Sequence, residues 1–183
     1  QKDFNKNDAQ KVIDYLQKGG KAIIVGMHSE TEMPNFASIL DTYGVSLTTG
    51  PIADNDAQHY YNMGGPLYLL PNVNSSSYTG SLSGGYVYLP ISLGINYPQN
   101  STTDDTESTE ESKTTYTSLL DTSDDAVAKN NPNSMQDYGY EDGDDKGSFS
   151  VGLAVEDKVD DDHTTQLVVF ASPYVFSDEA SQM

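Results

Sequence analysis

The sequence predicts an α/β fold in which helices pack in layers on a mostly parallel sheet. Two segments near the N-terminus have apolar residues at helical spacing, and each ends at a glycine followed by a short apolar run. At 183 residues, the chain is long enough to form a core without disulfides, and it contains no cysteine. We therefore expect a single α/β domain over residues 1–183.

The first predicted helix covers residues 7–18. Asn7 is its expected N-cap, and Gly19 is its expected left-handed stop. Residues 21–26 follow as a continuous apolar run rich in β-branched side chains, which is typical of a strand buried on both faces. The helix would pack through its apolar stripe at i, i+3, i+4 and i+7: Ala9, Val12, Ile13 and Leu16.

The second predicted helix begins at Pro34, a residue favoured at the first helical position, and ends before Gly44. A short strand is expected next, at residues 45–47. Two helix-to-strand steps in succession favour parallel strands covered by helices. The second helix has its own apolar face: Phe36, Ile39, Leu40 and Tyr43.

Polar and strand-like segments alternate in the middle of the chain. Residues 67–70 and 86–91 are strand-like, and Pro90 places the second of them at an edge or a bulge. Residues 96–116 form a low-complexity insertion dense in Ser, Thr, Asp and Glu, which buries too little to offset the entropy of ordering. A second polar tract, predicted to be a loop, covers residues 129–146.

The C-terminal part of the chain is predicted to contain an antiparallel hairpin. Residues 148–155 and 166–172 alternate or run apolar around an Asp-rich loop. Residues 119–128 predict a strand that passes into a helix capped by Ser123. Pro173 is expected to start a final helix.

Charge and hydropathy exclude several functions. The 28 acidic residues outnumber the nine lysines and give a formal net charge of -19, which would repel nucleic acid and anionic lipid headgroups. The aliphatic runs, such as residues 22–25, are far shorter than the roughly 20 residues of a membrane-spanning helix. Any signal peptide or membrane anchor is therefore expected outside this chain.

The strongest candidate binding residues follow the first strand. His28, Ser29 and Glu30 lie just past its carboxyl end, where α/β folds place their ligands. The alternative is an ordinary polar loop between strand and helix. Tyr60 and Tyr61 belong to a tyrosine-rich composition that suits a sugar- or protein-binding surface, or simply strands.

A candidate metal site lies near residue 144. Asp142, Asp144 and Asp145 surround a glycine turn in a pattern that can bind Ca²⁺. Lys146 stands where an oxygen ligand belongs, and Leu153 occupies the position of the closing glutamate of an EF-hand. A solvated loop is therefore the alternative, and we expect no cofactor other than calcium.

Catalytic signatures are missing from the sequence. The chain has three histidines, no cysteine and no G-x-S-x-G elbow around any serine. We therefore assign no catalytic residue and expect a protein that is not an enzyme.

Five segments, which cover about a quarter of the chain, carry a family resemblance: residues 12–25, 36–45, 119–123, 147–155 and 166–172. In this order they resemble the extracytoplasmic domain of GldG-like proteins, the gliding-motility-type auxiliary components of ABC transporters. The resemblance implies a flavodoxin-like or class I glutamine amidotransferase-like fold, although a chain without cysteine cannot perform amidotransferase chemistry. It also implies strands upstream of residue 12, so that the chain would hold only part of the fold.

The function expected from this resemblance is a non-catalytic binding or scaffold domain of an ABC-transporter accessory protein. Such a domain would lie outside the cytoplasm, tethered to the membrane by segments outside this chain, and would contact the permease and ATPase subunits. One alternative is a carboxylate- or metal-dependent carbohydrate-active hydrolase that uses residues near Asp142 or beside His28. Another is a structural surface domain without a transporter.

Overall fold

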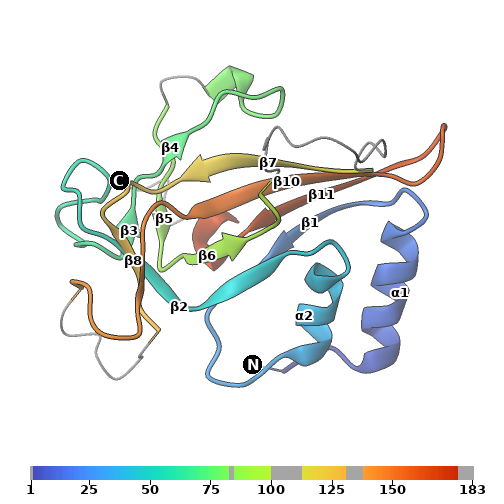
Figure 1. The fold of residues 1–183 in the computed structure, drawn as a ribbon, viewed down its shortest axis with the longest axis horizontal. Helices are drawn as coiled ribbons and strands as arrows, with labels where there is room; N and C mark the ends of the chain where they lie inside the picture. Colours follow the sequence, from blue (N-terminus) through green and yellow to red (C-terminus); the bar gives the residue numbers. More distant parts are fainter. Residues whose placement is uncertain (1, 83–84, 100–112, 131–137, 177–183) are drawn as a thin grey trace, which may run out of the picture.

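A computed structural model describes residues 2–82, 85–99, 113–130 and 138–176 (Figure 1). Two α-helices lie next to each other along one side of a large sheet. Neither of these two helices has the length and apolar character needed to cross a membrane. In chain order, the elements are α1 (Lys6–Leu16), β1 (Lys21–Val25), α2 (Pro34–Asp41), β2 (Ser46–Asp54), β3 (Tyr68–Leu69), β4 (Asn72–Val73), η1 (Gly80–Leu82), β5 (Leu89–Pro90), β6 (Leu93–Asn96), β7 (Thr114–Asp121), β8 (Ala126–Ala128), β9 (Asp145–Lys146), β10 (Ser150–Lys158), β11 (Thr164–Phe170) and η3 (Pro173–Phe176).

The sheet is mostly antiparallel, so the predicted layered, mostly parallel fold of the flavodoxin or amidotransferase type is wrong. The nine-stranded sheet has the order β1-β11-β10-β6-β2-β8-β9, with β7 beside β10 and β4 beside β7. Among the described strands, only β1 and β11 pair in parallel. The β10–β11 hairpin and β6 separate β1 from β2. Local periodicity predicted the order of helices and strands along the chain. It does not reveal which strand, distant in sequence, pairs with each predicted strand.

Both predicted helices are confirmed, and α1 covers Lys6–Leu16 where residues 7–18 were predicted. The N-cap of α1 is Asn5, not Asn7: its side-chain oxygen accepts a hydrogen bond from the Asp8 amide at 2.9 Å. Gly19 and Gly44 follow the two helices with positive φ angles of 83° and 66°, which favour glycine.

β1 is an edge strand and is not buried on both faces as its apolar sequence predicts. Lys21 is exposed, and 60% of Ile23 is exposed. The alternate residues Ala22 and Ile24 pack against the helices. A short apolar run therefore did not distinguish an edge strand with one covered face from a central strand.

The predicted helix after Ser123 is replaced by β8, which follows β7 after four residues. The Asp54 carboxylate accepts hydrogen bonds from the Ser123 amide at 2.8 Å and from its hydroxyl at 2.5 Å. Ser123 is thus engaged with β2 and caps no helix. The C-terminal hairpin is present as β10 and β11, and Pro173 begins the short 3₁₀ helix η3 where an α-helix was expected.

The two polar tracts are only partly described, since residues 100–112 and 131–137 lie outside the described residues. Both tracts are shorter than predicted: Asn96 belongs to β6 and residues 114–116 to β7, and residues 145–146 of the second tract form β9. Pro90 lies in the separate two-stranded β3–β5 sheet, which agrees with the expected edge position.

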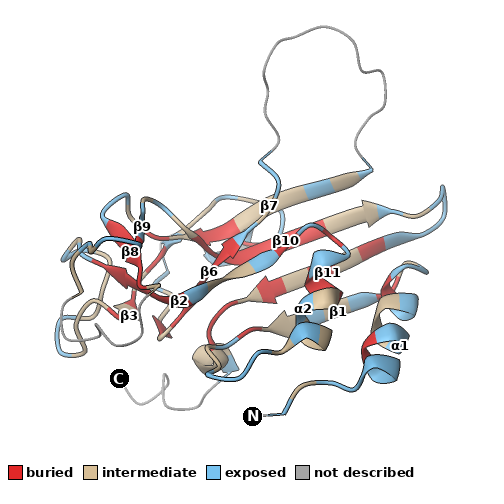
Figure 2. Cartoon of the chain, turned by 60° about the horizontal axis from the view of Figure 1, so that its bottom comes forward, coloured by how far each residue is buried: buried red, intermediate tan, exposed pale blue. Residues whose placement is uncertain are grey.

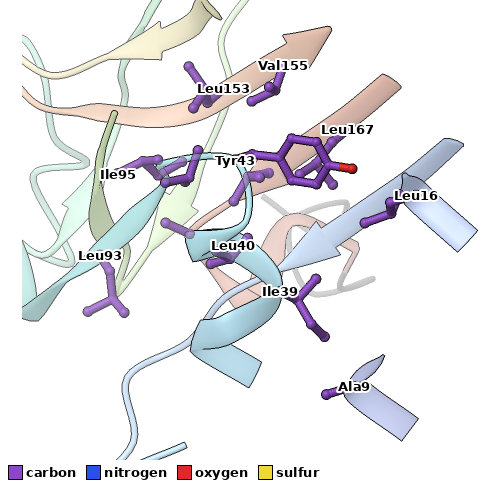
Figure 3. Packing of buried hydrophobic residues seen from close by; sticks show 13 residues of the cluster. Ala9, Leu16, Ile39, Leu40, Tyr43, Leu93, Ile95, Leu153, Val155 and Leu167 are labelled. Atoms are coloured by element: carbon purple, nitrogen blue, oxygen red, sulfur yellow. The ribbon is translucent and has the colours of Figure 1, made fainter. Parts of the chain in front are cut away.

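Two apolar clusters form the core on opposite faces of the sheet. We call the cluster beneath α1 and α2 the helix-covered core; it contains Leu16 and Ile39 of the helices and Leu167 of β11 (Figure 3). The second cluster includes Ile52, Leu69 and Leu89, and the short strands β3, β5 and β8 contribute to it. Figure 2 shows that buried residues concentrate in the middle strands, whereas the outer side of α1 is exposed.

Candidate functional site

The loop between β1 and α2 forms one wall of an open cavity at the carboxyl end of β1. This loop begins at Gly26, whose amide donates to the Phe170 carbonyl at 2.8 Å. Gly26 is buried beside Leu47, and a Cβ atom there would collide with Leu47 Cδ1, so a side chain would require the leucine to shift. The close approach brings the loop against β2, and the space between them opens toward α2.

This cavity, which we call the β1 pocket, has a volume of about 280 Å³. That is near the lower end of the roughly 300–1,000 Å³ typical of small-molecule sites. Its innermost lining is aliphatic and buried. The lining residues are Met27, His28, Ser29, Thr31, Glu32, Met33, Phe36, Ala37, Leu40, Asp41, Val45, Ser46, Leu47, Thr48, Thr49 and Leu93.

Two of the three predicted residues in this loop line the pocket. His28 Nδ1 lies 3.2 Å from the Thr49 carbonyl oxygen, so the ring is held against β2. The Ser29 hydroxyl donates to the Thr31 carbonyl at 2.8 Å and accepts from the Thr31 amide. Glu30 is exposed and does not line the pocket. His28 and Ser29 therefore bind backbone groups and do not form a base–nucleophile pair.

The pocket also contains residues that the sequence did not single out. Met27, Met33 and Phe36 supply large apolar surfaces at its mouth, whereas Leu40 and Leu93 are buried behind them. Phe36 and Leu40 belong to the predicted apolar face of α2, so the periodicity marked them as core residues. An apolar helix face indicates burial, but it does not reveal that part of that face remains open to a ligand.

Tyr60 and Tyr61 lie elsewhere. Tyr60 forms an isolated bridge with Leu69, and Tyr61 makes an edge contact with Tyr88 at a centroid distance of 6.1 Å. Tyr68 stacks on Tyr88. The structure therefore does not bring the tyrosines together with His28 and Ser29.

A buried lysine occupies the predicted metal site. The Lys129 side chain is 0% exposed, and its Nζ lies 2.6 Å from Asp144 and 3.1 Å from Glu141. It also donates to the Gly139 carbonyl at 2.8 Å. We call these four residues the Lys129 cluster. The ammonium group thus stands beside Asp144, where a bound cation would have to lie.

The other two predicted ligands do not point to the same place. The Asp145 carboxylate accepts from the Asn130 side chain at 3.2 Å, and Asp142 is exposed. In the described residues, no three His, Asp or Glu side chains are arranged to hold a metal ion. Calcium binding by this loop would require the Lys129 ammonium to leave Asp144.

The charges of the Lys129 cluster are mutually stabilised. Burial alone would raise the pKa of Asp144, but hydrogen bonds from Lys129, Asn130 and Glu141 outweigh it and hold the pKa below 3.8. Burial likewise lowers the pKa of Lys129, but the hydrogen bonds to Asp144 and Glu141 outweigh it and raise the pKa above 10.5. The cluster is therefore an ion pair at neutral pH.

β2 passes directly beneath this cluster. A Cβ atom at Gly50 would collide with the Lys129 carbonyl oxygen, so the position cannot hold a side chain without displacing β8. The Lys129 amide donates to the Pro51 carbonyl at 3.0 Å. In the sequence, Lys129 stands at the start of a polar tract. The composition of that tract does not distinguish a buried lysine from one exposed to solvent.

A polar depression lies between the loops that surround Ser123. Asp56, His59, Asp121 and Asp125 line it, and the buried Asp54 lies next to it in β2. Asp54 already accepts hydrogen bonds from Asp56 and Ser123. The depression is therefore an acidic surface beside the hydrogen bonds that Asp54 accepts.

Comparisons with known proteins identify the fold only. No family model matches the chain, and no curated protein matches it. A solved structure described as the mmIFT52 N-terminal domain is similar in fold, with a TM-score of 0.61 and 14% sequence identity. The match covers 97% of this chain, which spans 64% of the length of that structure. At this identity the likeness shows a shared architecture and supports the corrected topology.

Proposed function

We propose that this chain is a non-catalytic binding or scaffold domain that takes an apolar group of its partner or ligand into the β1 pocket. The β1 pocket carries this proposal. Its lining surface is mostly apolar, and its histidine and serine are engaged with backbone groups. Such a site supplies contact area and a few orienting polar groups, which suits binding more than bond cleavage.

The pocket fits an apolar side chain or a small apolar ligand. Met27 and Met33 have flexible thioether side chains that can adapt to different shapes. Glu32 and Asp41 add negative charge at the rim, and the whole chain has a formal net charge of -19. An anionic ligand is therefore disfavoured, and a neutral or cationic group with an apolar body is favoured.

The resemblance to GldG-like proteins extends this proposal to a particular setting. In it, the domain lies outside the cytoplasm as part of an ABC-transporter accessory protein. Segments outside this chain tether it to the membrane, and it contacts the permease and ATPase subunits. The sequence segments that resemble the family support this setting, and co-purification of the full-length protein with both subunits tests it.

The binding role is tested with a single fluorescent label, since the chain has no cysteine of its own. Ser46 lines the pocket and is exposed, so Ser46→Cys can carry a polarity-sensitive fluorophore. Titration with the permease–ATPase complex should shift its emission to the blue as water leaves the pocket. Asp14→Cys, on the exposed side of α1, is the matched control. An equal response of both labels, or none, would contradict binding at the pocket.

A further inference from the structure

The outer edge of β1 presents backbone groups that the described part of the chain leaves unpaired. β1 pairs with β11 on one side only. The Gly26 amide and the Gly20 carbonyl both bond to β11. Because alternate residues of a strand direct their N–H and C=O groups to the same side, residues 22 and 24 also face β11. Residues 21, 23 and 25 therefore direct theirs outward.

Tyr15 occupies the first of these outward positions. Its hydroxyl accepts from the Lys21 amide and donates to the Lys21 carbonyl, both at 3.1 Å. A side chain of α1 thus takes the place of a neighbouring strand at one residue. Beyond it, Ile23 and Val25 have no strand partner among the described residues. The open part of the edge therefore begins after Lys21 and contains the outward-facing residues Ile23 and Val25.

The sheet face beside this edge is apolar. Strand register places Ile23 next to Val168, and Val25 next to Phe170. These side chains lie on the face opposite α1 and α2, since Ala22 and Ile24 between them pack in the helix-covered core. Phe176, which is 66% exposed, makes an edge contact with Phe170 at 6.4 Å.

A polar row bounds the apolar face at the beginning of β1. Lys21, Gln166 and Glu156 are cross-strand neighbours, and the Gln166 side chain donates to Glu156 at 2.9 Å. Burial and a hydrogen bond to Glu156 raise the pKa of Tyr78 to about 12, so Tyr78 also belongs to this row. The exposed apolar surface is therefore limited to the end of β1 where the backbone is open.

The surrounding charge indicates which partner fits. Residues 1–21 contain five of the nine lysines and three of the 28 acidic residues, a formal +2. The rest of the chain has four lysines and 25 acidic residues, a formal -21. Lys18 and Lys21 stand at the beginning of the edge strand. A second copy of the chain would add another -19, and its β1 has no acidic residue to meet these lysines.

We infer that the outer edge of β1 is a strand-addition site for a partner protein. The added segment is extended, apolar at alternate positions, and acidic at the end that meets Lys18 and Lys21. Main-chain hydrogen bonds to Ile23 and Val25 supply pairing, and Val168 and Phe170 contact its apolar side chains. This surface is separate from the β1 pocket, so the inference goes beyond the proposed function and does not depend on it.

Hydrogen exchange of single amides tests this inference. The probes are capped heptapeptides in which Val and Thr alternate and two Asp residues stand at one end, in both orders so that parallel and antiparallel pairing are covered. Millimolar peptide should slow exchange several-fold at the amides of Ile23 and Val25. The amides of Ala22 and Ile24 already bond to β11 and should not change. No slowing, or equal slowing at all four amides, overturns the inference.

Control peptides and variants distinguish strand addition from unspecific adhesion. A peptide N-methylated on its pairing side, and one with Lys in place of Asp, should both lose most of the effect. Ile23→Lys should abolish it, while Met63→Lys makes the same charge change at a remote exposed position and should not. If Ile23→Lys does not fold by circular dichroism, the N-methylated peptide on the unmodified chain decides. The Ser46→Cys label should not respond to these peptides, which separates this site from the pocket.

Discussion

The helix-covered core and the Lys129–Asp144 pair of the Lys129 cluster are both buried, but they are held together by different interactions. The helix-covered core consists of aliphatic side chains and the buried Tyr43, and the buried Thr165 beside it donates to the Leu16 carbonyl. The Lys129 cluster buries a full ammonium group against two carboxylates. Apolar packing tolerates the loss of a contact gradually, whereas a buried charge requires every partner. The two regions should therefore respond differently to mutation and pH.

The largest expected effect is at Lys129. Lys129→Met keeps most of the side-chain volume but leaves the buried Asp144 carboxylate without its cation. Removing one partner of a buried pair costs about 3–5 kcal/mol, so urea unfolding should show a loss of that size. Lys146→Met is the matched control, because Lys146 pairs with Asp125 on the exposed surface and such pairs contribute about 0–1 kcal/mol. Equal losses of unfolding free energy in the two variants would contradict a larger contribution of the buried Lys129–Asp144 pair.

A comparable loss, with a different pH dependence, is expected in the helix-covered core. Leu167 of β11 is fully buried in this core, with Ala22 of β1 and Val155 of β10 as its strand neighbours. Leu167→Ala should cost about 2–5 kcal/mol through lost burial and the cavity that remains. Leu82→Ala, at a half-exposed position outside either core cluster, should cost much less. Thermal unfolding at several pH values should give the same loss for Leu167→Ala throughout.

A smaller effect is expected at Asp54, which connects β2 to the turn before β8. Asp54→Ala leaves the Ser123 amide and hydroxyl and the Asp56 amide without their acceptor. The loss of these bonds should cost about 1–3 kcal/mol in urea unfolding. Asp142→Ala removes an exposed carboxylate from a nearby loop and should be close to neutral. Equal unfolding midpoints for both variants would show that the Asp54 bonds add nothing.

The pH dependence should distinguish the Lys129 cluster from the helix-covered core. Because the Asp144 pKa is lowered on folding, its contribution is present above pH 3.8 and is lost as pH falls through the lower folded value. Because the Lys129 pKa is raised, its contribution is present below pH 10.5 and is lost as pH rises through the higher folded value. In Lys129→Met, burial without the lysine raises the Asp144 pKa, so the variant recovers stability as that carboxyl takes up a proton. The stability difference between wild type and Lys129→Met should thus be largest at mildly alkaline pH and shrink both as pH falls and as pH rises through the raised Lys129 pKa. A difference that stays the same down to acidic pH would contradict this assignment.

The smallest expected effect is that of calcium. Since Lys129 neutralises Asp144, millimolar Ca²⁺ should leave the melting temperature of the chain unchanged. A rise in melting temperature that disappears in Asp142→Asn would instead support the calcium site suggested by the sequence. Mg²⁺ at the same concentration controls for screening of the large negative charge.

The same two regions differ in how far the sequence could predict them. The helices of the N-terminal part were predictable because their apolar stripes, Pro34 and the stop glycines are local signals. The pairing of β1 with β11 was not, since it joins residues about 145 positions apart and no local pattern specifies a distant partner. Even where the strands were predicted correctly, their positions in the sequence do not specify how they pair, so the antiparallel sheet could not be derived from them.

The Lys129 cluster was missed because its signal resembles that of a solvated loop. Lys129 and Asp144 lie in a tract whose composition predicts exposure. Only the three-dimensional contact shows that their charges compensate one another. The candidate pocket was partly predictable, because His28 and Ser29 follow a strand end, but its apolar wall from α2 was predicted only as core.

Gly50 limits how the sequence of this fold can vary. Its φ angle is not in the left-handed region, so what it requires is the absence of a side chain beside the Lys129 carbonyl oxygen. Even alanine would push β8 away from β2 and lengthen the Lys129–Pro51 hydrogen bond. Relatives that share this packing should keep glycine here while their loops diverge freely. A relative with a larger residue at this position would need a different path for β8, and its buried lysine would be lost or replaced together with it.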